Sequence, residues 1–200
     1  MAYADVVNSV YRITRKEIVI SPAACALIGV FGFILATAAG AFIRIPLPFT
    51  PVPLTLQTFF VLLSGAILGR RLGILSQAGY VIVGLIGLPI FAGAHAGGAY
   101  FLGPTGGYLV GFAAASYVVG RILKGRRPAN LLKITFAMAA GSAVIYLFGA
   151  AWLAYILKIS FEKAMLLGVL PFLPGDIVKA AVAVALYKPI EKRMKDVFPA

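Results

Sequence analysis

SPAACALIGVFGFILATAAGAF, residues 21–42, is the stretch of this sequence that decides the fold. It contains no charged side chain, and about 20 apolar residues in a helix are enough to cross the hydrocarbon core of a bilayer. Ser21 and Pro22 supply an N-cap and a first-turn proline. The stretch predicts a transmembrane helix. Because it is too long for the apolar region of a signal peptide, we expect the polar segment up to Glu17 to stay attached.

The composition of the whole chain agrees with a membrane protein. Of the 200 residues, 62% are hydrophobic and 12% are charged, with a mean hydropathy of +0.99. A soluble domain carries roughly 25% charged residues. With short connections, this length leaves room for about six membrane spans and no separate soluble domain. We therefore predict an all-α integral membrane protein in which residues 1–200 form a single membrane domain.

Proline and glycine divide the rest of the chain into further apolar segments. Four prolines between residues 46 and 53 predict a stiff, extended loop, because proline lacks a backbone donor and has a fixed φ. Residues 89–103 form a glycine-rich loop, and we expect a break near 171–175 in the last helix. The six predicted helices are 21–42, 54–69, 72–88, 104–123, 131–157 and 162–187.

The positions of the basic residues test this topology, because Lys and Arg concentrate on the cytoplasmic side of membrane proteins. With both termini in the cytoplasm, the outer segments hold only three: Arg44, Lys158 and Lys163. The inner segments hold 14: Arg12, Arg15, Lys16, Arg70, Arg71, Arg121, Lys124, Arg126, Arg127, Lys133, Lys188, Lys192, Arg193 and Lys195. Membrane orientation thus accounts for the net charge of +12, and a nucleic-acid partner is not needed.

The remaining cation, Lys179, lies in the apolar run of the last predicted helix, three residues after Asp176. The two side chains project from one helical face. Ionisable groups inside a bilayer are costly and by default indicate a functional site. Asp176 also follows Pro174-Gly175, where a helix N-terminus offers free N–H groups to a small polar solute. The alternative is a salt bridge that only orients the helix.

Other residues allow two interpretations each. His95 either contacts a ligand or is an ordinary loop residue, since it has no neighbouring ligands for a metal. The aromatic residues near the outer ends of the spans fit an interfacial belt or the wall of an apolar pocket; they are Phe49, Phe91, Tyr100, Tyr108 and Trp152. We expect Cys25 to serve as a packing residue in its apolar segment. A single cysteine excludes an internal disulfide.

Gly32, Ala36 and Gly40 form a stripe of small residues along the first predicted helix. Such stripes let membrane helices approach closely, either within one chain or between two chains. The chain has no Gly-x-x-x-x-Gly-Lys-Ser/Thr loop for binding ATP phosphates. Energy-driven work would therefore need a partner, and the stripe is a candidate docking surface for it.

Four motifs in order resemble the biotin-specific S component (BioY) family of energy-coupling-factor transporters. They are IPLPFTPVPLTLQ (45–57), GLPIFAG (87–93), GPTGGYLVGF (103–112) and LPGDIVK (173–179), and the resemblance extends from about Ala23 to Tyr187. It implies a six-helix bundle with an outward-facing biotin pocket beneath the loops after the first and third helices. It also implies assembly with a membrane coupling protein and two cytoplasmic ATPases in a prokaryotic plasma membrane.

In this family the acid and base of the Pro-Gly-Asp-x-x-Lys motif contact the ligand, which implies that role for Asp176 and Lys179. A carboxylate accepting from the ureido N–H groups of biotin and an ammonium donating to its carbonyl would be complementary; alternatively, Lys179 binds the valerate carboxylate. The other residues expected at the ligand are Phe49, Thr50, Phe91, His95, Tyr100 and Tyr108. The stripe at Gly32, Ala36 and Gly40 would reach the coupling protein.

Two other functions are compatible with a six-helix membrane protein. An S component for thiamine or riboflavin would have the same fold but should lack the Pro-Leu-Pro-Phe and Pro-Gly-Asp-x-x-Lys motifs. An intramembrane enzyme would need paired carboxylates, a metal site or a nucleophile with its base. One membrane acid and one histidine argue against it. We therefore expect no catalytic residue, metal or cofactor.

Overall fold

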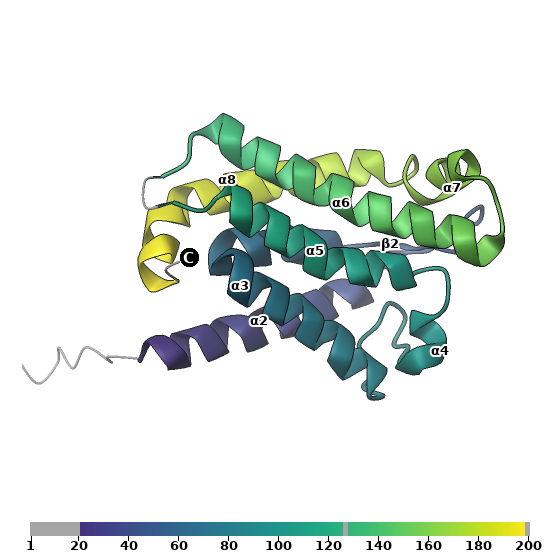
Figure 1. Ribbon diagram of the computed structural model, residues 1–200, viewed down its shortest axis with the longest axis horizontal. Helices are drawn as coiled ribbons and strands as arrows, with labels where there is room; N and C mark the ends of the chain where they lie inside the picture. Colours follow the sequence, from purple (N-terminus) through teal and green to yellow (C-terminus); the bar gives the residue numbers. More distant parts are fainter. Residues whose placement is uncertain (1–20, 126–127, 199–200) are drawn as a thin grey trace, which may run out of the picture.

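The uncharged stretch at 21–42 forms helix α2 (Pro22–Phe42), and the Ser21 hydroxyl accepts the Ala24 N–H at 3.2 Å as its N-cap. The computed structural model describes residues 21–125 and 128–198. The predictions for Arg12, Arg15, Lys16, Arg126 and Arg127 lie outside the described residues, as does that for the segment up to Glu17. The long helices lie side by side along one axis (Figure 1).

Helix α3 (Gln57–Leu85) is a hairpin of two antiparallel legs and not one straight rod. Gly69 interrupts it with φ 75° and ψ 179°, a backbone conformation that favours glycine. The Gln57 amide donates to the Tyr80 hydroxyl at 2.7 Å, although 23 residues of straight helix would separate them by about 34 Å. The legs, 57–68 and 70–85, correspond to the second and third predicted helices.

The second half of the bundle consists of α5 (Gly106–Ile122), α6 (Leu131–Leu157), α7 (Phe161–Gly168) and α8 (Leu173–Val197). Helices α7 and α8 meet at a bend of 60°, and the break between them spans residues 169–172, slightly before the predicted 171–175. The last helix continues to Val197, ten residues beyond the predicted end, because Pro189 is accommodated within it.

Length and apolarity qualify α2, α3 and α6 as membrane spans, and the bent α7–α8 pair adds a fourth. Since α3 is a hairpin of two legs and α5 has 17 residues, the described residues 21–125 and 128–198 make six passes. The start of α2 and the end of α8 lie at the same end of the bundle. Gly29 in α2 packs close to Phe198 after α8, since a Cβ added to Gly29 would lie 3.0 Å from the Phe198 ring. An even number of passes requires this arrangement.

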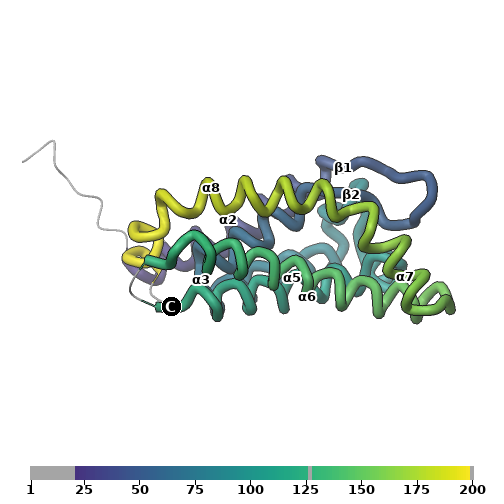
Figure 2. Tube along the Cα trace, turned by 90° about the horizontal axis from the view of Figure 1, so that it is seen from above, coloured from purple at the N-terminus to yellow at the C-terminus, as the bar shows by residue number. Residues whose placement is uncertain are grey.

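The end opposite the termini contains elements that the sequence did not predict. Strands β1 (Arg44–Ile45) and β2 (Leu54–Thr55) pair antiparallel, so β2 takes up residues expected in the second helix. Figure 2 shows their connecting loop reaching out at the same end as α7. The glycine-rich loop contains a short helix, α4 (Gly97–Phe101). The first leg of α3 is only about 18 Å long, shorter than the roughly 30 Å hydrocarbon core of a bilayer.

Buried polar side chains connect α2 to both legs of α3. The Gln77 amide donates to the Ser64 hydroxyl at 3.1 Å and to the Thr37 hydroxyl at 3.3 Å, and all three side chains are fully buried. In a membrane such contacts stabilise helix association, because the alternative is an unpaired polar group in hydrocarbon.

The close approach of α5 to the turn of α3 leads to a testable expectation. A Cβ on Gly120 would come within 2.7 Å of Gly69 and Arg70 backbone atoms, which cannot rotate away. We expect Gly120→Ala to lower the midpoint of thermal unfolding in detergent, with a cost of about 1 to 3 kcal/mol for overpacking. Gly32→Ala is the control, since nothing lies within 4 Å of its Cβ position. Equal midpoints for the two variants would contradict the described packing.

Candidate functional site

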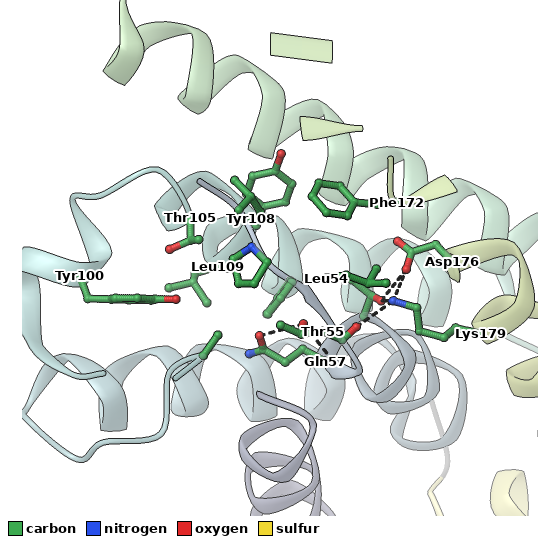
Figure 3. A pocket seen from close by; sticks show the side chains of 15 residues that line it. Leu54, Thr55, Gln57, Tyr100, Thr105, Tyr108, Leu109, Phe172, Asp176 and Lys179 are labelled. Atoms are coloured by element: carbon green, nitrogen blue, oxygen red, sulfur yellow. Dashed lines mark hydrogen bonds and ion pairs between the residues drawn. The ribbon is translucent and has the colours of Figure 1, made fainter. Parts of the chain in front are cut away.

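A small cavity lies near the outer end of the bundle, between β2, the first leg of α3, α5 and α8 (Figure 3). It has a volume of about 50 Å³. Its wall is formed by Val52, Pro53, Leu54, Thr55, Gln57, Thr58, Ala92, Tyr100, Thr105, Tyr108, Leu109, Phe112, Phe172, Asp176 and Lys179. Of the predicted site residues, the structure brings four to this wall: Tyr100, Tyr108, Asp176 and Lys179.

Asp176 is positioned by the break that precedes α8. The helix begins at Leu173 with Pro174 in its first turn, so the Asp176 carboxylate lies near a helix N-terminus, where negative charge is favoured. The side chain is buried. Its Oδ1 accepts the Thr58 hydroxyl at 3.1 Å and the Lys179 ammonium, and its Oδ2 accepts the Tyr146 hydroxyl at 2.5 Å.

Lys179 lies one turn further along α8 and is held by the first leg of α3. Its Nζ donates to the Thr55 carbonyl oxygen at 2.8 Å and to the Thr58 hydroxyl at 2.9 Å, in addition to its ion pair with Asp176. An ammonium has three donors, and these three contacts engage them all. Asp176 and Lys179 therefore form a salt bridge, and both residues also line the cavity.

The rest of the wall combines a few polar groups with aromatic and aliphatic surface. The side-chain amide oxygen of Gln57, Oε1, accepts the Thr55 hydroxyl at 3.1 Å. The Tyr108 hydroxyl donates to the Gly168 carbonyl at 2.7 Å, so its ring faces the cavity while its polar end is occupied. A mostly apolar wall with few, well-placed polar groups is typical of small-molecule sites.

Phe91 and His95 lie next to the cavity wall without forming part of it. Both rings stack on Tyr100, with centroid distances of 5.3 Å for Phe91 and 5.0 Å for His95. The Nδ1 atom of His95 lies 2.9 Å from the Ala92 carbonyl oxygen. By stacking on Tyr100, the two rings support a side chain that does line the cavity.

The loop between β1 and β2 holds the remaining predicted ligand contacts away from the cavity. Phe49 is 57% exposed, and the Thr50 hydroxyl accepts the Val52 N–H at 3.3 Å. Neither residue is part of the wall.

The predicted docking stripe on α2 is not one continuous surface. Gly32 is exposed with open space around it, and Ala36 is partly buried. Gly40 is buried against the backbone of Leu56 and Gln57, so it serves packing within the chain.

Comparisons with known proteins identify the family. A sequence profile described as "BioY family" matches residues 14–196. The chain is 47% identical over 154 residues to the "Probable biotin transporter BioY" of Pyrococcus horikoshii, covering 77% of this chain and 88% of that protein. It is 38% identical to the "Biotin transporter BioY" of Thermotoga maritima, covering 80% and 92% of the two chains.

The chain belongs to the BioY family.

A solved structure supports the fold of this BioY-family member. It is described as "Crystal structure at 2.1 A of the S-component for biotin from an ECF-type ABC transporter". The TM-score is 0.77 at 28% identity, over 84% of this chain and 90% of that one. The predicted six-helix, S-component-like membrane fold is thereby confirmed, and the chain is a multi-pass protein of a prokaryotic plasma membrane.

Five polar residues that contact the Asp176–Lys179 pair or line its cavity were absent from the predicted set for this BioY chain: Thr55, Gln57, Thr58, Thr105 and Tyr146. Gln57 lies in the first motif of the family resemblance, and an amide in an apolar segment could have suggested it. Thr58 and Tyr146 carry no such signal, because single hydroxyl groups are common in membrane helices. Only the packing of α3 and α6 against α8 places them on Asp176.

Proposed function

We propose that the chain captures biotin at the outer face of the membrane, in the cavity beside Asp176, as the substrate-binding subunit of an energy-coupling-factor transporter. The observation that carries the proposal is a buried carboxylate with acceptor capacity to spare. A carboxylate has about four acceptor positions, and Thr58, Lys179 and Tyr146 occupy three. The names of the relatives, which are biotin transporters, point to the same ligand.

The chemistry of biotin complements this wall. The ureido group has two N–H donors, and one of them can use the free acceptor position of Asp176. Its carbonyl group needs a donor, and Lys179 can provide one only by releasing Thr55, Thr58 or Asp176, since all its donors are engaged. The same limit applies if Lys179 binds the valerate carboxylate. Tyr100, Tyr108 and other apolar wall residues would cover the thioether ring and the chain.

Binding requires the cavity to enlarge. Its 50 Å³ would hold only a few waters, whereas small-molecule sites measure about 300 Å³ or more. Residues 52–55 of the wall belong to the β1–β2 loop and to strand β2, outside the helices. We propose that this loop lifts to admit biotin and then closes over it. Phe49 and Thr50 reach the ligand only through that movement, and Phe91 and His95 act by supporting Tyr100.

Transport would depend on partners. The sequence contains no phosphate-binding loop for ATP, so a membrane coupling protein and two cytoplasmic ATPase subunits would supply the energy. The open surface at Gly32, continued by Ala36, is the part of the small-residue stripe that remains available to another helix. In this account the chain is a transporter subunit and not an enzyme.

The proposal is tested by the ligand that the protein retains. We expect the purified chain to release biotin on denaturation, identified by mass spectrometry, and to rebind one biotin per chain in calorimetry. Thiamine and riboflavin are the competitors, and saturating amounts of either should leave biotin affinity unchanged. Retention of thiamine or riboflavin in place of biotin would overturn the assignment. Conversion of a bound molecule into a product by the purified chain would overturn the assignment to a transporter subunit.

A further inference from the structure

The Asp176 carboxylate lies between two hollows of different character. On one side is the cavity described above. On the other is an apolar hollow of about 520 Å³ between α6 and α8, lined by both helices. Ile177 and Leu131 belong to this second hollow and are 67% and 58% exposed, so in a membrane it opens toward lipid. Asp176 and Tyr146 both line it.

The two carboxylate oxygens have different partners. Oδ1 contacts Thr58 and Lys179, which line the ligand cavity. Oδ2 accepts the hydroxyl of Tyr146, which comes from α6 and lines the apolar hollow but not the ligand cavity. Tyr146 is 8% exposed, so its hydroxyl is buried together with the carboxylate. No other hydrogen bond to Oδ2 is found within the described part of the chain.

We propose that Tyr146 is a positioning residue of the ligand site, which holds the Asp176 carboxylate turned toward the cavity with one acceptor position left for the ligand. Hydrocarbon provides no donor, so without the phenol Oδ2 would face the apolar hollow unpaired, at high cost. The carboxylate would then rotate to share Lys179 and Thr58 between both oxygens. That rotation would consume the position that a ureido N–H needs. The inference rests on the proposed function, because its ligand is biotin.

The test compares Tyr146→Phe with a matched variant on the same helix. Phenylalanine keeps the ring and removes only the hydroxyl. A hydrogen bond to a charged group corresponds to roughly a 10- to 100-fold change in affinity, and we expect Tyr146→Phe to weaken biotin binding by that factor in calorimetry. Tyr155→Phe is the control, since Tyr155 is 76% exposed on α6, and it should change the dissociation constant by less than about twofold.

A double-mutant cycle separates positioning from general structural support. If Tyr146 acts through Asp176, adding Tyr146→Phe to Asp176→Asn should weaken binding by less than about threefold, because the group it positions is already changed. Binding is measured with biotin up to millimolar concentration. Biotin methyl ester, which keeps the ureido group, should show the same loss with Tyr146→Phe as biotin does.

Several results would overturn the inference. They are unchanged or tighter biotin binding by Tyr146→Phe, an additive cycle, or a loss seen with biotin but not with its methyl ester. Failure of the proposed function would give a different result from failure of this inference. If the parent chain and Tyr155→Phe fail to bind biotin, the ligand assignment fails and this inference fails with it. If the parent binds and Asp176→Asn weakens binding while Tyr146→Phe does not, only the role of Tyr146 is refuted.

Discussion

Asp176→Ala is expected to lower the affinity for biotin by roughly 30-fold to several thousand-fold, which corresponds to about 2 to 5 kcal/mol. The change removes the acceptor proposed for the ureido group. It also leaves the Lys179 ammonium, which is largely buried, without its counter-charge. Both consequences act in a site from which water is excluded, where polar interactions are strong. Calorimetric titration of the detergent-solubilised variant measures the effect.

The control for Asp176→Ala is Asp196→Ala on the same helix. Asp196 is exposed at the far end of α8, so its removal should leave biotin affinity and thermal stability close to those of the parent. A folded Asp176→Ala variant is recognised by a single size-exclusion peak and a cooperative thermal transition. If that folded variant binds biotin as tightly as Asp196→Ala does, Asp176 has no role in the ligand site.

The second large effect concerns stability at the cytoplasmic end. Glu191 is 1% exposed, and its Oε1 accepts the Ala129 N–H at 2.7 Å and the Lys195 ammonium at 2.8 Å. Lys188 donates to the Ala129 carbonyl at 2.5 Å. Glu191 and Lys188 thus fasten the segment before α6 to the end of α8.

Glu191→Ala is expected to destabilise the protein by about 2 to 4 kcal/mol, because it leaves the buried Ala129 N–H unpaired and removes the ion pair between Glu191 and Lys195. Glu191 also lies 3.7 Å from the Lys188 ammonium, but Lys188 is 41% exposed, so the loss of this second ion pair adds little to the cost. The midpoint of thermal unfolding measures the loss. Glu191→Gln should fall in between, since its amide oxygen still accepts the Ala129 N–H.

Glu162→Ala is the matched control for Glu191→Ala, because Glu162 is exposed in α7. Biotin affinity per folded molecule should be the same in all three variants, since Glu191 lies at the opposite end of the bundle from Asp176. An unchanged midpoint for Glu191→Ala would refute the fastening role. If Glu191→Ala lowered biotin affinity per folded molecule while Glu162→Ala did not, the expectation that Glu191 affects stability but not ligand binding would be wrong.

The membrane made much of this fold predictable. A bilayer requires long apolar helices, so proline, glycine and the charged turns marked where each one ends. The turn at Gly69-Arg70-Arg71 was located correctly, because glycine and cations are typical of a helix end on the cytoplasmic side. The β1–β2 ladder was not predicted. Its four paired residues lie outside the proline cluster, and proline content says nothing about whether flanking residues pair.

The candidate site was predictable only in part, and for a different reason. Asp176 and Lys179 were conspicuous because charge inside an apolar helix is rare. Thr58 and Tyr146 became recognisable only when helix packing placed them on the carboxylate. Phe49 was expected at the ligand, yet its ring is exposed, because a loop sequence does not specify which side of the loop faces inward. Side-chain direction in irregular segments depends on tertiary contacts.

The most direct test of the central claim is a crystal structure of this chain with biotin bound. We predict that biotin lies in the cavity beneath residues 52–55, with a ureido N–H within about 3.2 Å of Asp176 Oδ2. The Tyr146 hydroxyl should still donate to Oδ2, and Thr58 and Lys179 should still contact Oδ1. Biotin in the apolar hollow between α6 and α8, or in the cavity with its ureido group turned away from Asp176, would contradict the account.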